Sequence, residues 1–296
     1  MPSADGISPN HLAEGMKNKN NTYCLEGSIP SVLVISATDS AGCAGMMADL
    51  RVCAAMKVYP SCAVTAVTAQ NSLGIKGGMP VSPELLSQQI QCAVVQQKPN
   101  AIKIGLLPNA SLIRALTHSI TDSGLPDIVL DTVGGATAGR MFDCGTESWR
   151  EAVLKLLPLC TIVTPNIPEL RILADMEVKD TMSIFNAAHK MQNDYGVRYL
   201  LVKGGHGTSA DSCVDYLFRP DKGNPLTFTA QKIKTVNLRG TGCTLSTAIA
   251  CYLAKGLNLE EAVFKAHLYM QEAIRAGREH CYCGGPGPVE HFPEYD

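Results

Sequence analysis

Residues 31–67 read SVLVISATDSAGCAGMMADLRVCAAMKVYPSCAVTAV and contain a pattern that recurs along the chain. A short apolar run at 31–37 is followed by a segment with helical periodicity at 44–58 and by a second apolar run at 61–67. Short apolar strands that alternate with helices are typical of a mainly parallel sheet. The stretch therefore predicts an α/β fold whose central sheet is flanked by helices on both faces.

The same alternation continues toward the C-terminus. Strand-like runs recur as AIKIGLL at 101–107, DIVLDTV at 127–133, CTIVTPN at 160–166 and YLLVKGG at 199–205, and helical periodicity recurs at 83–97 and 148–157. Because no linker rich in proline or serine divides this region, we expect a single domain over residues 29–296. Residues 1–28 are polar and lack an apolar core pattern, which predicts a disordered N-terminal extension.

The composition favours a protein that acts on a small molecule. The chain has 296 residues, of which 46% are hydrophobic, and a formal net charge of −2. Because no dense run of lysine or arginine occurs, neither nucleic acid nor an anionic membrane is expected as the main partner. The longest apolar runs are far too short to cross a bilayer.

The cysteines raise the question of disulfide bonds or a metal site. All 12 are scattered through the chain, and no secretory signal precedes them, so we expect a reducing, cytoplasmic setting. His280, Cys281 and Cys283 lie close together in the sequence. The second pair of ligands that a structural zinc site needs does not follow at the usual spacing, which argues against such a site.

Polar residues gather where the predicted strands end. In open α/β sheets, ligands bind beyond the carboxyl ends of the parallel strands. A glycine turn at Gly240, which follows the strand-like run QKIKTV at 231–236, joins the same edge. The other residues expected at this edge are Asp39, Gln70, Asn71, Lys103 to Leu106, Asp131, Asn166, Glu169 and Lys203 to Gly205.

A cysteine lies where the glycine turn becomes a helix. In LRGTGCTLSTAIACYLAKG, residues 238–256, Gly240, Thr241 and Gly242 form the turn and Cys243 falls in the first helical turn. The unpaired backbone N–H groups of that turn favour both a bound phosphate and a thiolate. The alternative is that the turn serves packing and that the cysteine is a small buried apolar residue.

Asp131, Asn166 and Glu169 carry the oxygen ligands that suit a magnesium-bound nucleotide. Asn166 followed by Glu169 is also the pattern of a helix N-cap with its capping-box partner. The spacing leaves both interpretations open. Several common sites are excluded, because the sequence contains no GxxxxGK[ST] phosphate loop, no GxSxG nucleophile elbow and no HExxH zinc motif.

Seven segments together resemble the hydroxymethylpyrimidine/phosphomethylpyrimidine kinases of thiamine biosynthesis, a branch of the ribokinase-like superfamily. In chain order they are ATDSAGCAGMMADL, VTAVTAQNSLG, AIKIGLL, IVLDTV, TIVTPNIPEL, LLVKGGH and RGTGCTLSTAIA, and the resemblance extends to GPVEHF at 287–292. It implies a ribokinase-like fold, a homodimer, and the cofactors ATP and Mg²⁺. The implied reaction is phosphorylation of 4-amino-5-hydroxymethyl-2-methylpyrimidine and of its monophosphate.

The resemblance also implies roles for particular residues. Cys243 would be the base for the hydroxymethyl group, where most ribokinase-like enzymes have an aspartate, and the amides of residues 240–243 would stabilise the transferred phosphoryl group. Without the resemblance, Gln70 would be a strand-end amide that satisfies backbone groups, and Asp49 an exposed helix carboxylate. The implied pyrimidine contacts are Gln70, Asp49, Leu106 and Val133, the nucleotide contacts are Asn166, Glu169, Lys203 and Arg239, and the metal ligands are Asp131 and Glu169.

The chain departs from the family pattern in three places. Residues 40–43 read SAGC where the family has PSGG, and residues 134–140 read GGATAGR where the family has Met followed by AKSGD. Leu238 and Arg239 replace the usual Thr-His. Arg239 is either a phosphate contact that compensates for the change or a solvent-facing side chain.

Two other functions stay open on the sequence. Pyridoxine/pyridoxal kinases share the cysteine turn, and their acceptor is likewise a flat heteroaromatic ring with a hydroxymethyl group. A non-catalytic ligand-binding protein that kept the fold is the alternative of another class, and the altered segment at 134–140 motivates it.

Overall fold

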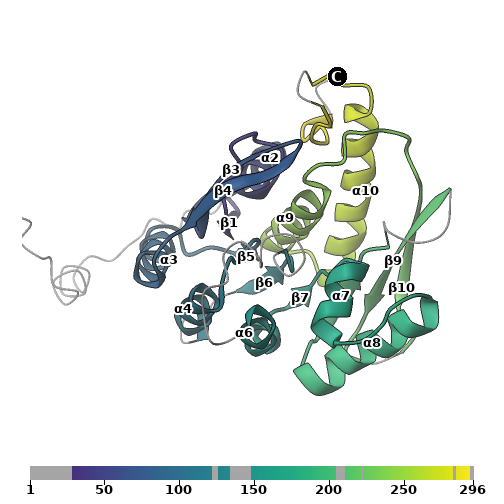
Figure 1. Cartoon of the computed structure of the whole chain (residues 1–296), viewed down its shortest axis with the longest axis horizontal. Helices are drawn as coiled ribbons and strands as arrows, with labels where there is room; N and C mark the ends of the chain where they lie inside the picture. Colours follow the sequence, from purple (N-terminus) through teal and green to yellow (C-terminus); the bar gives the residue numbers. More distant parts are fainter. Residues whose placement is uncertain are drawn as a thin grey trace, which may run out of the picture.

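The computed structural model describes residues 29–121, 126–133, 148–204, 211–221, 223–282 and 285–293. These residues form an eight-stranded sheet with the strand order β10-β9-β8-β7-β6-β5-β1-β2 (Figure 1). The expectations for the extension at 1–28 and for the segment at 134–140 lie outside the described residues.

The sheet is parallel except at one edge. β1 pairs in parallel with β2 and β5, and the parallel pairing continues through β6, β7 and β8. β9, in contrast, pairs antiparallel with β8 on one side and with β10 on the other. The prediction of a mainly parallel sheet is therefore confirmed. The strands are β1 Ser31–Ser36, β2 Tyr59–Val64, β5 Ala101–Ile104, β6 Asp127–Leu130, β7 Ile162–Val163, β8 Tyr199–Val202, β9 Ser212–Phe218 and β10 Leu226–Gln231.

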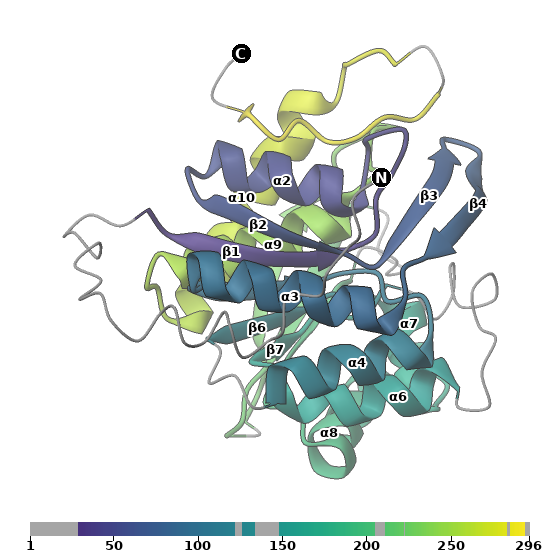
Figure 2. The same ribbon diagram turned by 90° about the vertical axis from the view of Figure 1, so that its left-hand side faces the viewer.

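Helices cover both faces of this sheet, as Figure 2 shows. One face carries α2 (Gly45–Ala55), α9 (Thr241–Ala254) and α10 (Leu259–Gly277). The other face carries α3 (Pro83–Gln97), α4 (Ala110–Thr121), α6 (Trp149–Leu156), α7 (Ile167–Ala174) and α8 (Thr181–Tyr195), with a short 3-10 turn, η1, at Leu157–Leu159.

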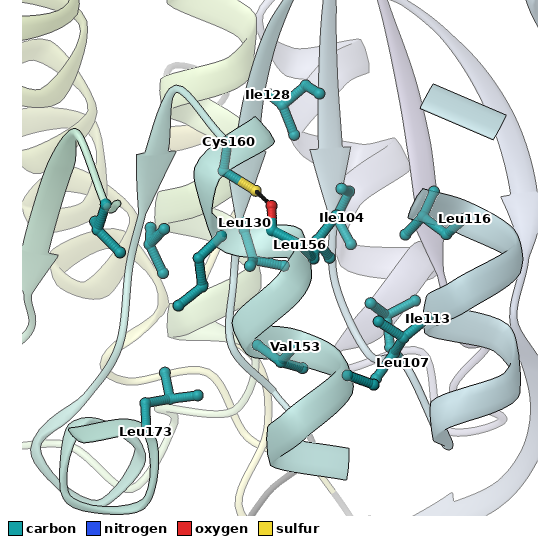
Figure 3. Packing of buried hydrophobic residues seen from close by; sticks show 14 of the residues in the cluster. Ile104, Leu107, Ile113, Leu116, Ile128, Leu130, Val153, Leu156, Cys160 and Leu173 are labelled. Atoms are coloured by element: carbon teal, nitrogen blue, oxygen red, sulfur yellow. Dashed lines mark hydrogen bonds between the residues drawn. The ribbon is translucent and has the colours of Figure 1, made fainter. Parts of the chain in front are cut away.

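Alternate residues of each strand enter two separate cores. In β1, Val32 and Val34 pack in the core under α2, α9 and α10, whereas Leu33 and Ile35 pack under the helices of the other face. Side chains of a strand point alternately to opposite faces, so a strand covered on both sides is apolar throughout. Figure 3 shows part of the second core, in which Ile104 of β5 and Leu130 of β6 lie beside Leu156 of α6.

A two-stranded hairpin stands apart from the main sheet. It consists of β3 (Ala66–Asn71) and β4 (Gly74–Pro80) and projects beyond the sheet in Figure 2. The chain bends from β2 into β3 at Thr65, whose Oγ1 donates a hydrogen bond to the Leu106 carbonyl at 2.7 Å. The bend places the hairpin next to the segments that follow β1 and β5.

The helices at 83–97 and 148–157 are confirmed. α3 begins where Ser82 caps it, because the Ser82 hydroxyl accepts from the Leu85 amide at 3.1 Å and Pro83 occupies the first turn. The prediction of a strand over residues 231–236 is wrong. β10 ends at Gln231, where its pairing with Ser212 of β9 also ends, and residues 232–239 lie outside the strands.

Candidate active site

A cavity of about 240 Å³ lies at the carboxyl ends of β1, β5 and β6. Its walls also include residues of the β3–β4 hairpin, of the loop before α2 and of the first turn of α9. Parallel strands end together at this edge, which is where open α/β sheets bind ligands. The predicted site residues that line the cavity are Gln70, Leu106, Val133, Arg239 and Cys243.

Gln70 contributes to the cavity from the end of β3. Ser40 binds the backbone of Gln70. The backbone N–H of Gln70 donates to Ser40 Oγ at 2.8 Å, and Ser40 Oγ donates to the backbone carbonyl of Gln70 at 2.9 Å. These backbone groups are therefore satisfied without the Gln70 side chain, whose amide can offer both a donor and an acceptor to a ligand. Leu106 and Val133 supply apolar parts of the wall.

The turn before α9 requires glycine at Gly240. Its φ is +79°, and a Cβ there would lie 2.2 Å from the Cys43 carbonyl oxygen. Thr244 makes the first helical bond, donating to the Gly240 carbonyl at 2.8 Å, and Gly240 has no side chain that could cap the helix. The amides of Thr241, Gly242 and Cys243 thus belong to the first helical turn, where helix geometry provides no acceptor within the helix.

Cys243 is 9% exposed and lines the cavity. Burial raises the pKa of its thiol to about 12, against the opposing effect of the Lys103 ammonium and the Gly45 backbone amide. In the ligand-free protein, burial therefore opposes the thiolate that the helix terminus favours.

Arg239 lines the cavity and is only partly exposed to solvent. Its side chain is 22% exposed, and its Nη2 is 3.8 Å from Asp39 Oδ2. The Asp39 carboxylate also accepts from the amides of Ala41, Cys43 and Ala44 at 2.9, 3.0 and 2.9 Å, which holds the loop between β1 and α2. This position at the cavity wall favours the phosphate-contact interpretation of Arg239 over the solvent-facing one.

Asp49 does not line the cavity, and both expectations for it are corrected. The residue is fully buried, its two oxygens accept from Lys103 Nζ at 2.9 Å, and its Oδ1 accepts from Thr247 Oγ1 at 2.7 Å. It is neither an exposed helix carboxylate nor in contact with the cavity. Sequence reasoning missed this pairing, although a single lysine within the apolar run at 101–107 was a signal that it needs a buried partner.

Asp131 and Lys203 form an ion pair beneath the first turn of α9. Lys203 Nζ is 2.8 Å from Asp131 Oδ1, and Ser246 of α9 donates to Asp131 Oδ2 at 3.3 Å. A Cβ at Gly242 would lie 3.4 Å from Lys203 Nζ. Although burial opposes ionisation, the ammonium groups of Lys203 and Lys103 hold the pKa of Asp131 below its usual value.

Asn166 and Glu169 form the capping box that their spacing predicts. Asn166 Oδ1 accepts from the Glu169 amide at 2.8 Å, and Glu169 Oε2 accepts from the Asn166 amide at 2.9 Å. Glu169 Oε2 also accepts from Thr132 Oγ1 at 2.8 Å. Both bonds use the same oxygen, so capping does not by itself occupy Oε1.

The residues present fit a magnesium ion that is held together with a nucleotide. In the described ranges, no group of three His, Cys, Asp or Glu side chains is arranged to hold a metal by itself. Mg²⁺ is usually bound by one or two carboxylates with phosphates and water. Asp131 and Glu169 provide carboxylates of that kind beside Lys203, whose pKa both of them raise.

Cys283 of the sequence motif at 280–283 lies outside the described residues.

Comparison with known proteins identifies the relatives of the chain. Residues 39–290 match the family model described as phosphomethylpyrimidine kinase. The thiamine biosynthetic bifunctional enzyme TH1 of Arabidopsis thaliana is 33% identical over 89% of this chain and 50% of its own length, so the chain spans about half of that relative. The hydroxymethylpyrimidine/phosphomethylpyrimidine kinase of Staphylococcus aureus is 34% identical over 88% of this chain and 92% of its own.

A solved structure supports the same fold. The ADP complex of Bacillus subtilis pyridoxal kinase superposes with a TM-score of 0.79 at 27% identity, covering 89% of this chain and 98% of that one. The ribokinase-like fold is therefore confirmed. Across the helices that the structure describes, none could span a membrane.

Proposed function

The chain belongs to the phosphomethylpyrimidine kinase family, and on this basis we propose that it transfers the γ-phosphoryl group of ATP to 4-amino-5-hydroxymethyl-2-methylpyrimidine. The monophosphate of this alcohol is the proposed second acceptor. One observation carries the proposal: Gln70, with the polar groups of an amide, and Cys243, at the start of α9, line the same cavity. One cavity could thus both bind the acceptor ring and place its hydroxymethyl group beside Cys243.

The acceptor ring is proposed to lie between Leu106 and Val133 with its amino-bearing edge on Gln70. A flat heteroaromatic ring suits apolar walls with a few placed polar groups. The Gln70 side chain donates to a ring nitrogen and accepts from an exocyclic amine. This assigns Gln70, Leu106 and Val133 to acceptor binding.

Cys243 is proposed to take the proton of the acceptor hydroxyl. A general base must lie within hydrogen-bond reach of that proton and be deprotonated when transfer begins. Burial raises the pKa of the free thiol, so the groups that favour the thiolate matter, and in this chain they are the Lys103 ammonium and the Gly45 amide, with the helix terminus of α9.

The nucleotide phosphates are proposed to lie at the first turn of α9. The amides of Gly240, Thr241, Gly242 and Cys243 would bind the charge that develops on the transferred group, and Lys203 and Arg239 would contact the phosphates. Asp131 and Glu169 would hold Mg²⁺, with Asn166 positioning Glu169. Bound Mg²⁺ supplies neutralisation of phosphate charge.

The proposal is tested by acceptor-dependent release of ADP. Purified protein with ATP and Mg²⁺ is expected to release ADP when the pyrimidine alcohol is added, and mass spectrometry is expected to find its phosphate ester. The control is the same mixture without acceptor. Absence of both products at millimolar acceptor would refute the proposal. Absence of products with pyridoxal and pyridoxine as well would favour a non-catalytic ligand-binding protein.

Pyridoxal kinase activity is the second candidate, because the superposed solved structure is a pyridoxal kinase. The same assay with pyridoxal and pyridoxine separates the two candidates through kcat/KM. We expect the pyrimidine to be the better acceptor, since the named relative that this chain covers almost completely is a pyrimidine kinase. A higher kcat/KM for pyridoxal would replace the first proposal with the second.

The homodimer and the cytoplasmic location belong to the proposal as well. Both derive from the family resemblance and the cysteine usage. Light scattering coupled to size-exclusion chromatography tests the homodimer through the molar mass of the particle. Fractionation of the source cells tests the location.

A further inference from the structure

Ser36 ends β1 at the wall of the cavity and has a buried hydroxyl without a partner. The residue is 0% exposed, it lines the cavity, and its Oγ makes no hydrogen bond to any described residue. Buried polar groups in proteins are almost always hydrogen-bonded. A buried hydroxyl that lacks a protein partner and lies against an open cavity is therefore placed to bond a ligand.

The two threonine hydroxyls of the cavity wall, in contrast, already take part in hydrogen bonds within the protein. Thr38 Oγ1 accepts from the Thr68 amide at 3.2 Å, and Thr68 Oγ1 donates to the Thr38 carbonyl at 2.7 Å. Both bonds fasten the hairpin to the segment after β1. Ser36 differs from these residues because its hydroxyl does not stabilise the wall.

Gly105 packs closely against the Ser36 hydroxyl on the side of Lys103. A Cβ at Gly105 would lie 2.5 Å from Ser36 Oγ and 2.7 Å from Lys103 Nζ, so only glycine fits at this point. Lys103 Nζ donates to both oxygens of Asp49. Ser36 thus lies between a buried ion pair and the cavity, in a setting where a hydrogen bond to a ligand is shielded from water.

We propose that the Ser36 hydroxyl donates a hydrogen bond to a ring nitrogen of the acceptor and is, with Gln70, a determinant of acceptor specificity. The proposal rests on the proposed function. The ring is the expected partner because the hydroxymethyl group must face Cys243 and the phosphoryl donor at α9. Ser36, in contrast, closes a strand whose six residues are all buried, so only the most deeply inserted part of the ligand reaches it.

The test compares Ser36→Ala with Ser61→Ala. Ser61 lies on β2, its Oγ is also buried without a partner among the described residues, and it does not line the cavity. We expect Ser36→Ala to raise the acceptor KM roughly 5- to 50-fold, because the ring nitrogen is left buried and unpaired. The KM of ATP and kcat are expected to stay within twofold, and Ser61→Ala is expected to leave all three unchanged.

A second readout separates ligand binding from a structural role. Since the Ser36 hydroxyl has no described partner in the free protein, Ser36→Ala is expected to leave its melting temperature unchanged or raised. The additional rise in melting temperature caused by the pyrimidine is expected to shrink. A structural role for the hydroxyl would instead lower the melting temperature of the free protein.

Calorimetric titration with the pyrimidine alcohol tests the inference without turnover. A wild-type protein that binds the pyrimidine but releases no ADP would refute the proposed function and still allow the Ser36 test through Kd. An acceptor KM and Kd within twofold of wild type in Ser36→Ala would overturn the inference. An equal loss in Ser61→Ala would overturn it as well.

Discussion

At the scale of single residues, Gln70 shows how a backbone bond prepares a side chain for binding. Ser40 satisfies the amide and the carbonyl of Gln70, so the side chain is not needed to complete the local structure. The sequence alone left open whether this glutamine satisfies strand-end backbone groups or binds a ligand. Because Ser40 already bonds the backbone groups of Gln70, its side chain is not required to satisfy them.

The variant Gln70→Ala is predicted to weaken acceptor binding alone. Leaving the ring edge unpaired costs about 1–3 kcal/mol, so the KM of the pyrimidine is expected to rise roughly 5- to 100-fold while the KM of ATP stays constant. Initial-rate kinetics and calorimetric titration with the pyrimidine measure the effect. Unchanged pyrimidine affinity in the variant would remove Gln70 from the site.

Glu169 combines a structural and a proposed catalytic role in one carboxylate. Its Oε2 completes the capping box with Asn166 and accepts from Thr132. An amide at this position keeps the shape and one acceptor oxygen but loses the negative charge. The charge therefore distinguishes a cap from a magnesium ligand.

We predict that Glu169→Gln lowers kcat roughly tenfold or more at saturating Mg²⁺, because the stabilisation of phosphate charge is lost. Its melting temperature is expected to stay close to that of wild type, since the capping bonds are retained. Steady-state kinetics over a range of Mg²⁺ concentrations, with thermal unfolding as a control, measure both. A near-normal kcat would show that the residue only caps α7.

At the scale of elements, one buried ion pair joins α2, β5 and α9. Lys103 Nζ bonds both oxygens of Asp49 at 2.9 Å, and Thr247 of α9 bonds the same carboxylate at 2.7 Å. All three side chains are fully buried. This contact therefore connects α9, the helix that carries Cys243, to α2 and β5.

Lys103→Met is predicted to destabilise the protein by roughly 3–5 kcal/mol, because it leaves the Asp49 carboxylate buried and unpaired. The double variant Lys103→Met/Asp49→Leu replaces the pair by apolar side chains of similar size and is expected to recover most of the loss. Urea unfolding measures the free energy in each case. A single variant as stable as wild type would contradict the importance of the pair.

The success of sequence interpretation differs between elements for physical reasons. α3 could be predicted to the residue because its start depends on the local contact between Ser82 and Leu85. The end of β10 could not, since it is set by pairing with β9. For the same reason the run at 61–67 falls in two sheets, as β2 ends at Val64 and β3 begins at Ala66.

At the scale of the whole molecule, the cavity lies where the parallel strands end and the hairpin approaches them. The topology rule predicted from sequence that Gln70, Leu106 and Cys243 would lie near one edge, because that rule needs only the order of strands and helices. It could not predict that Asp49 pairs with Lys103, 54 positions away, behind the cavity. It also gave no indication that burial raises the pKa of Cys243 to about 12.

The central claim is that this single cavity binds the acceptor and removes its proton through Cys243. In Cys243→Ala the backbone amides of α9 remain, so the calorimetric affinities for nucleotide and pyrimidine are expected to be retained. Turnover is expected to fall, because the base is lost. Cys243→Asp, which restores an acid–base group, is the matched variant and is expected to recover more activity than alanine.

The most direct measurement is kcat of Cys243→Ala with the pyrimidine alcohol and saturating ATP. The account predicts a fall of about 10²- to 10⁴-fold, the usual contribution of a general base, in a protein that is folded and binds both ligands. A folded alanine variant with kcat within a few-fold of wild type would contradict the account. Cys243 would then be a packing residue at the start of α9.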